Sequence, residues 1–257
     1  MIAGVEEGLL PVLTRLEPQD PPSTNPANEV ARVLTGRDYL SWSAISTFRT
    51  CPLKYWFRYV AGMPEESASS ALVFGTGIHA AIQFGNTETR ASLDALAAKM
   101  LTAFLNSPAA SVQGRVLGVE EEIRGTLVEG VPDLYGRIDL VTEDEDRLVL
   151  TDFKTSRAKW SPEQAEDAGE QLLLYSKLAG DLAPGKKLVT RFLVLTKTKD
   201  PVIEEHLGEV RPDRVARTVT SVERVWKAIA SENFYPAPSV VGCASCGYRK
   251  ACEGWRG

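Results

Sequence analysis

Two aspartates and a lysine occur at spacings that would bring them together on one β-hairpin. In residues 136–154, apolar and polar side chains alternate on both sides of the acidic cluster 143–146, which is typical of two strands joined by a turn. Asp152 and Lys154 share a face of the second strand, and Asp139 can lie beside them on the first. Such a group is costly on apolar strands unless its charges are paired or bind a metal, and hard oxygen ligands suit Mg²⁺ or Mn²⁺. The alternative interpretation is a surface salt bridge at a strand end.

The segments around this hairpin predict an α/β protein. Residues 40–60 have the pattern of two short helices, with a break at Cys51 because Pro52 disfavours helix at the residue before it. A helix start is expected at Ser161, where Pro162 and Glu163 follow a serine cap. Periodicity predicts further helices over 72–85, 90–105 and 211–234, and strands over 115–128, 186–197 and 201–207.

Composition and the chain start limit the protein class. A chain of 257 residues can bury a substantial core, and its net charge of −5 argues against indiscriminate polyanion binding without excluding a locally basic nucleic-acid site. The first residues lack a basic region ahead of an apolar run, so we expect a soluble, cytoplasmic protein. The proline-rich residues 1–38 are expected to form a flexible arm, and residues 39–257 the folded domain.

The order of the polar motifs resembles the PD-(D/E)xK nuclease superfamily, in particular its RecB-like branch. The resemblance covers roughly residues 40–257, and it rests on His79, Glu120, Asp139, the run Asp152, Phe153 and Lys154, and finally Gln171 and Tyr175. It implies a restriction-endonuclease-like fold, a central mixed sheet flanked by helices.

The same resemblance implies roles for these residues. The two aspartates, Glu120, His79 and the Phe153 backbone carbonyl would bind a divalent metal, and Lys154 would position or activate water. Gln171 and Tyr175 would lie beside the active site. Two alternatives stay open here: Glu122 lies on the same side of its strand as Glu120, and a lone histidine such as His79 can simply pack near a core.

Four cysteines form a second constellation. Cys243, Cys246 and Cys252 cluster in the C-terminal region 236–257, and Cys51 lies nearly two hundred residues upstream. This pattern resembles the iron-sulfur subset of RecB-like nucleases, which includes the AddB nuclease domain and the CRISPR-adaptation nucleases. It implies a [4Fe-4S] cluster that joins the two chain ends, although four thiolates also suit Zn²⁺.

Basic residues flank these cysteines in the sequence. If the chain ends meet, they form a basic rim for single-stranded DNA, with Tyr248 and Trp255 available to stack on bases. The rim comprises Arg49, Lys54, Arg58, Arg249 and Lys250, and Arg157 and Lys159 extend it.

We therefore expect a Mg²⁺- or Mn²⁺-dependent exonuclease that acts on single-stranded DNA ends in repair or recombination. The chain has no Walker-type ATP-binding motif, so a helicase partner would have to supply any motor. The alternatives are a CRISPR-adaptation nuclease that trims DNA before integration, and a non-catalytic DNA-binding or assembly module.

Overall fold

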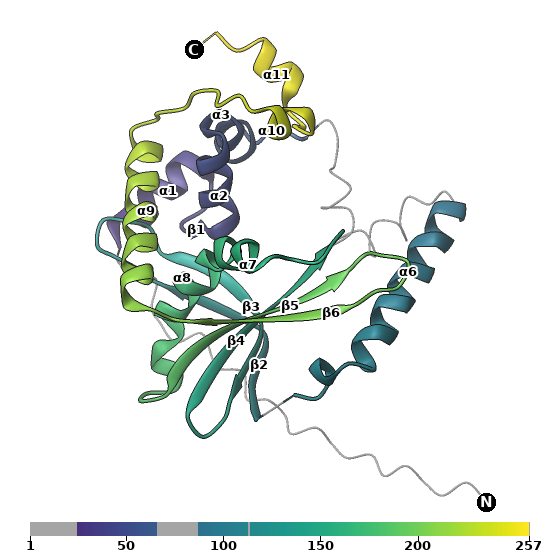
Figure 1. Cartoon of the computed structure of the whole chain (residues 1–257). Coiled ribbons are helices and arrows are strands. Elements are labelled where there is room, and N and C mark those ends of the chain that lie inside the picture. Colours follow the sequence, from purple (N-terminus) through teal and green to yellow (C-terminus); the bar gives the residue numbers. More distant parts are fainter. Residues whose placement is uncertain (1–24, 66–86, 113, 257) are drawn as a thin grey trace, which may run out of the picture.

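A mixed β-sheet lies at the centre of the computed structural model, with helices packed around it (Figure 1). The structure describes residues 25–65, 87–112 and 114–256. The described strands are β1 (Leu40–Ser41), β2 (Arg115–Gly125), β3 (Leu134–Glu143), β4 (Arg147–Ser156), β5 (Lys187–Thr196) and β6 (Ile203–Glu209). They are ordered β1-β3-β4-β5-β6, and β2 also pairs with β3. The pairs β1–β3 and β4–β5 are parallel, and the others are antiparallel. The predicted central mixed sheet with flanking helices is confirmed.

The predicted central hairpin is the pair β3 and β4. Its turn is closed by Asp144, whose carboxylate accepts hydrogen bonds from the backbone N–H groups of Asp146 and Arg147. Leu148 and Leu150 of β4 are fully buried. The alternation in the sequence therefore arises from a sheet whose apolar side chains enter the core.

Two helices cross from β4 to the parallel strand β5. Helix α7 (Pro162–Ala168) begins with a capping box between Ser161 and Gln164, and α8 (Glu170–Ala179) follows directly after Gly169. Parallel strands require such a crossover. Helix α8 buries Leu172 and Leu174 in the main core, so its position relative to the sheet is set by packing.

The described part of the predicted N-terminal arm, residues 25–38, differs from the expected flexible segment. Helix α1 (Pro26–Thr35) is capped by Asn25 and buries Ala27 and Ala31 in the main core. Asn28 is also buried and donates from Nδ2 to the Asp133 carboxylate at 2.8 Å. Because this contact is polar, apolar periodicity does not reveal it. Residues 1–24 lie outside the described part of the chain.

Among the remaining helices, those of residues 42–60 lie beside the C-terminal helices α10 (Val240–Ala244) and α11 (Arg249–Glu253) at the top of Figure 1, and Leu53 and Phe57 pack against Tyr248 there. Helices α2 (Trp42–Thr50) and α3 (Pro52–Tyr55) are separated at the extended residue Cys51, as predicted, and α3 continues into a π-helical turn, Trp56–Val60. The others are α6 (Thr87–Leu105) and α9 (Pro212–Ala230). The predicted helix over 72–85 lies outside the described residues. Within the described ranges, no helix is both long enough and apolar enough to span a bilayer.

Candidate active site

Along one edge, β3 has two different neighbours, β1 at its start and β4 at its end. We call the place where these two neighbours separate the fork. Along the opposite edge, β2 pairs with β3 over its whole length. On the forked edge, β1 pairs only with Leu134 and Tyr135, and β4 pairs only with the segment from Leu140 to Glu143. Residues 136–139 therefore face a gap in the sheet between β1 and β4.

The two predicted aspartates lie at this fork. Continuing the register past the last pair, Leu140 with Thr151, would place Asp139 opposite Asp152. The strands separate at this point, and the Asp139 Oδ2 atom accepts a hydrogen bond of 2.7 Å from the Phe153 backbone N–H. The structure thus brings together the two carboxylates that the hairpin pattern predicted to converge.

Asp152 is the buried member of the pair. Its residue is 5% exposed, and its Oδ2 atom lies 2.6 Å from Lys154 Nζ without a hydrogen bond of good geometry. Burial raises the pKa of Asp152 above its usual range, the Lys154 ammonium opposes this shift, and the Asp139 carboxylate adds to it. A further positive charge near Asp152 would therefore stabilise its ionised carboxylate.

Glu120 lies in the same row of the sheet. Val119 pairs with Leu140 and Glu121 with Ile138, so Glu120 is opposite Asp139. Its φ of +53° is in the left-handed region that residues other than glycine rarely adopt, and such strain is concentrated at functional sites.

Glu122, the alternative to Glu120, occupies a different place. It is paired in register with Arg137, and its hydrogen bond with the Tyr135 hydroxyl is the main cause of the raised pKa of Tyr135. The geometry therefore favours Glu120 as the third carboxylate of the row, a choice that parity along the strand left open.

Gln171 and Tyr175 approach the fork from helix α8. Gln171 Nε2 donates to the Tyr175 hydroxyl at 3.2 Å, as expected for residues one turn apart. Burial raises the pKa of Tyr175, a hydrogen bond from Gln171 lowers it, and the carboxylates of Asp152 and Asp139 raise it further. The nearby Arg137 backbone lowers the same pKa, and the Tyr175 ring lies directly against Gly136 at the gap in the sheet.

Gly136 provides the space for Tyr175. A Cβ atom at this position would overlap the Tyr175 ring. We predict that Gly136→Ala displaces the ring, lowers the free energy of unfolding by about 1–3 kcal/mol, the range for overpacking, and reduces activity. Chemical denaturation and a cleavage assay measure the two effects.

Two further variants make this prediction specific. Gly180→Ala is the control, because a Cβ atom there meets no atom within 4 Å. In the Tyr175→Ala background the Gly136→Ala change should cost little, since the obstructing ring is gone. Equal costs in both backgrounds would show that Gly136 does not act through Tyr175.

Comparison with known proteins identifies the family. The family model of the PD-(D/E)XK nuclease superfamily matches residues 39–253. This chain belongs to that superfamily. None of the curated proteins with which the sequence was compared matches it significantly.

A solved structure shares the fold of this nuclease-superfamily chain. A crystal structure from Eubacterium rectale with the name "Putative exonuclease" is 14% identical, has a TM-score of 0.56, and is matched over 93% of this chain and 94% of that one. A second structure, SSO0001, is 15% identical and is matched over 84% of this chain and 86% of that one, with a TM-score of 0.45. At these identities the likeness concerns the fold alone.

Nucleases of the PD-(D/E)XK superfamily typically use divalent metals, and the chemistry of the fork suits one. Asp139, Asp152 and Glu120 offer hard oxygen ligands, and Asp152 Oδ2 is buried without a good hydrogen bond. Within the described ranges, however, no three His, Cys, Asp or Glu side chains are close enough together to hold a metal ion. Glu120 is instead turned toward Arg137, with 3.1 Å between Oε2 and Nε. His79, the predicted fourth side chain, lies outside the described residues.

The four cysteines of this superfamily member lie near one another, and none forms a disulfide. Cys51, Cys246 and Cys252 pack around a small apolar cluster formed by Leu53, Phe57 and Tyr248. Burial raises the pKa of the Cys252 thiol, and the other three cysteines raise it further. Cys243 accepts a hydrogen bond from the Ser239 N–H at 3.4 Å. Cysteines from both chain ends are thus gathered, although not at the spacing of a metal site in this structure.

Tyr248 differs from its predicted role as an exposed base-stacking residue. It is 2% exposed, its ring stacks on Phe57, and its hydroxyl donates to the Met63 carbonyl at 3.1 Å. Trp255 packs against Trp56, with 4.9 Å between ring centroids. Tyr248 is therefore buried in the apolar cluster with Leu53 and Phe57, whereas Trp56 and Trp255 pack against this cluster and stay half-buried.

Several residues of the predicted basic rim form ion pairs. Arg49 pairs with Glu170 next to Gln171, so its guanidinium is close to the α8 end of the candidate site. The other pairs are Arg58 with Glu65, Lys159 with Glu204, and Arg249 with Glu253. Such pairs on the surface contribute little to stability. The DNA-binding role of the rim stays a prediction.

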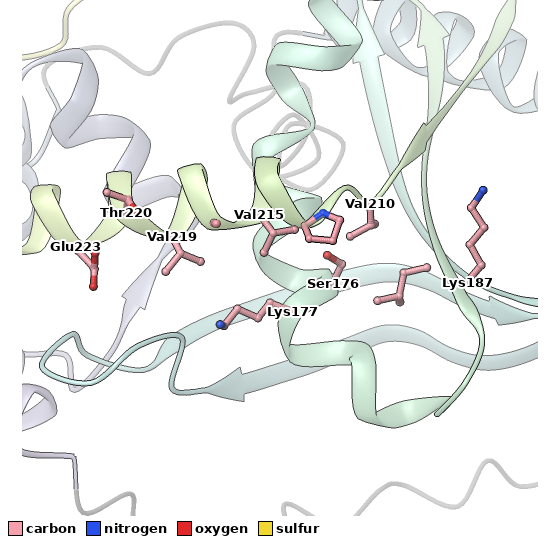
Figure 2. Close-up of a pocket in the computed structure, with 11 residues that line it drawn as sticks. Ser176, Lys177, Lys187, Val210, Val215, Val219, Thr220 and Glu223 are labelled. Carbon is pink, nitrogen blue, oxygen red and sulfur yellow. The ribbon is translucent and has the colours of Figure 1, made fainter.

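A groove between helices α8 and α9 is separate from this site. Its volume is about 710 Å³, and Figure 2 shows Val215 and Val219 of α9 on one side and Ser176 and Lys177 of α8 on the other. None of the predicted catalytic residues lines it. The groove therefore has no part in the proposed chemistry.

Proposed function

We propose that this chain is a metal-dependent deoxyribonuclease of the RecB-like branch, an exonuclease that acts on single-stranded DNA ends in repair or recombination. The observation that carries the proposal is the row of Glu120, Asp139 and Asp152 across three adjacent strands, with Lys154 on the last of them. A salt bridge at a strand end would need neither the strained Glu120 nor the buried Asp152.

The residues of the fork would have different roles in phosphodiester hydrolysis. Asp139, Asp152 and Glu120, with His79 and the Phe153 carbonyl, would hold a divalent ion, Mg²⁺ or Mn²⁺. When bound, such an ion lowers the pKa of water and neutralises charge on a phosphate. Lys154 Nζ, which lies beside Asp152, would orient the attacking water and stabilise charge on the phosphate oxygens.

Gln171 and Tyr175 complete the site from helix α8. Tyr175 is buried and bonded to Gln171, so its hydroxyl is held at the fork and excludes bulk water from one side. We infer that the pair orients the scissile strand relative to the carboxylates.

A cleavage assay with end-labelled DNA tests the proposal. Single-stranded and double-stranded substrates are incubated with Mg²⁺, Mn²⁺ or EDTA, and products are followed over time. We expect metal-dependent shortening from the ends of the single strand. Absence of cleavage under all metal conditions would contradict the proposed activity, and internal cuts would contradict the exonuclease assignment alone.

The row of carboxylates also predicts different effects for two neighbouring glutamates. Glu120→Gln should reduce cleavage by about tenfold or more, because it removes a charge opposite Asp139, whereas Glu122→Gln should reduce it by less than about threefold. Rates at saturating Mn²⁺ measure both. If the larger loss belongs to Glu122, the assignment of the third ligand is wrong.

We further propose that Cys51, Cys243, Cys246 and Cys252 hold a [4Fe-4S] cluster, with Zn²⁺ as the alternative occupant. The proposal is supported by the packing of Cys51, Cys246 and Cys252 on one apolar cluster, by the effect of the other three cysteines on the Cys252 pKa, and by the N–H group at Cys243. Such a centre would be a structural staple between the chain ends. It needs no redox role in DNA hydrolysis.

The substrate path and partners belong to the same proposal. Arg49, Lys54, Arg58, Arg249 and Lys250 would follow a single strand over the joined chain ends, with Arg157 and Lys159 at the active-site side. Phosphate contacts release counterions, so binding should weaken as salt increases. A helicase would act as the partner that delivers single-stranded ends.

A further inference from the structure

We propose that the ion pair between Arg137 and Glu120 is a metal-controlled latch for DNA binding. In the metal-free chain, Arg137 holds the Glu120 carboxylate. When a divalent ion takes Glu120, the Arg137 guanidinium is released to contact a DNA phosphate next to the cleavage site. This inference rests on the proposed function and adds an order of events to it.

The position of Arg137 supports such a role. It lies two residues before Asp139 on β3, beside the gap of the fork, and its backbone is close enough to the Tyr175 hydroxyl to lower the pKa of that group. Its main chain is therefore tied to the candidate site on the α8 side. Its side chain is exposed and reaches across to β2, where Nε lies 3.1 Å from Glu120 Oε2.

Glu120 is also arranged to change partners. Its side chain is 58% exposed, as is that of Arg137, so their ion pair is well solvated and weak. Its backbone has a φ of +53° directly opposite Asp139, which places the carboxylate at the end of the acidic row. A divalent ion bound by Asp139 and Asp152 would compete for this carboxylate with a stronger charge than a single guanidinium has.

The exchange couples two binding events. Metal must displace Arg137 from Glu120, so Arg137 weakens metal binding when DNA is absent. The released guanidinium has the planar donor geometry that suits phosphate oxygens, so metal strengthens DNA binding. By thermodynamic linkage, DNA must strengthen metal binding by the same factor. The latch would therefore favour a site that holds both metal and DNA over a site that holds either one alone.

The first test is the affinity for Mn²⁺ in the absence of DNA, measured by electron paramagnetic resonance or calorimetry. We expect Arg137→Gln to tighten Mn²⁺ binding about three- to fivefold, because one exposed charge about 4 Å from a ligand has an effect of this size in water. A merely structural ion pair predicts unchanged or weaker binding. Either of those results would overturn the latch.

The second test is the effect of Mn²⁺ on the affinity for a hydrolysis-resistant phosphorothioate single strand, measured by fluorescence anisotropy. In the parent protein, Mn²⁺ should tighten DNA binding. In Arg137→Gln this gain should shrink about threefold or more, while metal-free DNA binding stays nearly unchanged. An undiminished gain would overturn the proposal.

Arg115→Gln is the matched control. Arg115 is an exposed arginine on the same strand as Glu120, about five residues or roughly 16 Å away, and it pairs with Glu143. Arg115→Gln changes the net charge by the same amount as Arg137→Gln. Equal tightening of Mn²⁺ binding in both variants would therefore point to a general charge effect and overturn the latch. These measurements need no cleavage. A parent that cleaves DNA but lacks the coupling disproves the latch alone, whereas a parent that binds no Mn²⁺ disproves the proposed function as well.

Discussion

Asp152→Asn is expected to reduce DNA cleavage by at least about a hundredfold, the scale on which a group that stabilises charge in a transition state acts. The carboxylate is buried beside Lys154, and its Oδ2 atom lacks a good hydrogen bond, so its charge is the feature that a metal ion would use. Asparagine keeps the size of the side chain and removes that charge. A cleavage time course at saturating Mn²⁺ measures the loss.

The same variant should be at least as stable as the parent when metal is absent. Burial raises the pKa of Asp152 in the folded protein, so the folded state binds a proton more readily than the unfolded state. The stabilisation from that proton is present at low pH and is lost as pH rises through the folded pKa. At neutral pH the parent has lost this stabilisation and keeps an ionised carboxylate buried, whereas the asparagine variant has no charge to bury. Thermal unfolding in EDTA should show a stability gain at neutral pH that shrinks as the pH falls toward the acidic range.

Two companion variants test whether the loss of cleavage arises at the reacting phosphate. Asp139→Ala and Lys154→Ala should also abolish cleavage while retaining most of the DNA affinity, because they act at the reacting phosphate. Full cleavage by Asp152→Asn would refute the assigned site. A neutral-pH stability below that of the parent would instead show that the Asp152 charge supports the fold.

Cys51→Ala and Cys252→Ala are expected to cause the largest loss of stability. The two cysteines come from opposite ends of the chain and pack on the same apolar cluster. A covalent link that closes a loop as long as residues 51–243 would remove unfolded-state entropy worth about 5 kcal/mol in the chain-entropy model. Metal binding to thiolates adds to folding in the same direction. These variants should therefore be protease-sensitive or insoluble before any effect on chemistry can be measured.

Iron and acid-labile sulfide analysis of anaerobically purified protein checks the nature of the link. The parent and Lys154→Ala should contain both elements in similar amounts and absorb visible light through sulfur-to-iron charge transfer, whereas the cysteine variants should not. One zinc and no iron per chain would exclude the cluster and keep the staple. Cysteine variants as stable as the parent would exclude the staple too.

The sequence predicted the central hairpin because its information is local. Alternating side chains and the acidic cluster at 143–146 specify two strands and a turn, and the turn is closed by Asp144 with its own neighbours. The helices that begin at Ser161 and break at Cys51 were likewise readable, since capping and the effect of proline act over a few residues.

Other features depend on contacts between distant segments. Helix α1 is anchored through Asn28 and Asp133, a pair of buried polar residues that no apolar period can reveal. Tyr248 looked like an available stacking residue, and only its contact with Phe57 shows that it belongs to the cluster between the chain ends. Gly136 leaves space for the Tyr175 ring of helix α8, a contact between two separate elements.

By itself, the sequence determined the identity of the charged groups and the order in which they occur: Asp139 and then Asp152 and Lys154 on one hairpin, and Gln171 and Tyr175 one helical turn apart. Only the tertiary structure shows that Glu120, and not Glu122, lies opposite Asp139. Glu120 and Glu122 have the same parity, and the pairing register of β2 with β3, together with the strained backbone at Glu120, separates them. The physical reason is that parity follows from the geometry of a single strand, whereas register depends on how two strands, distant in sequence, pack their apolar faces into one core.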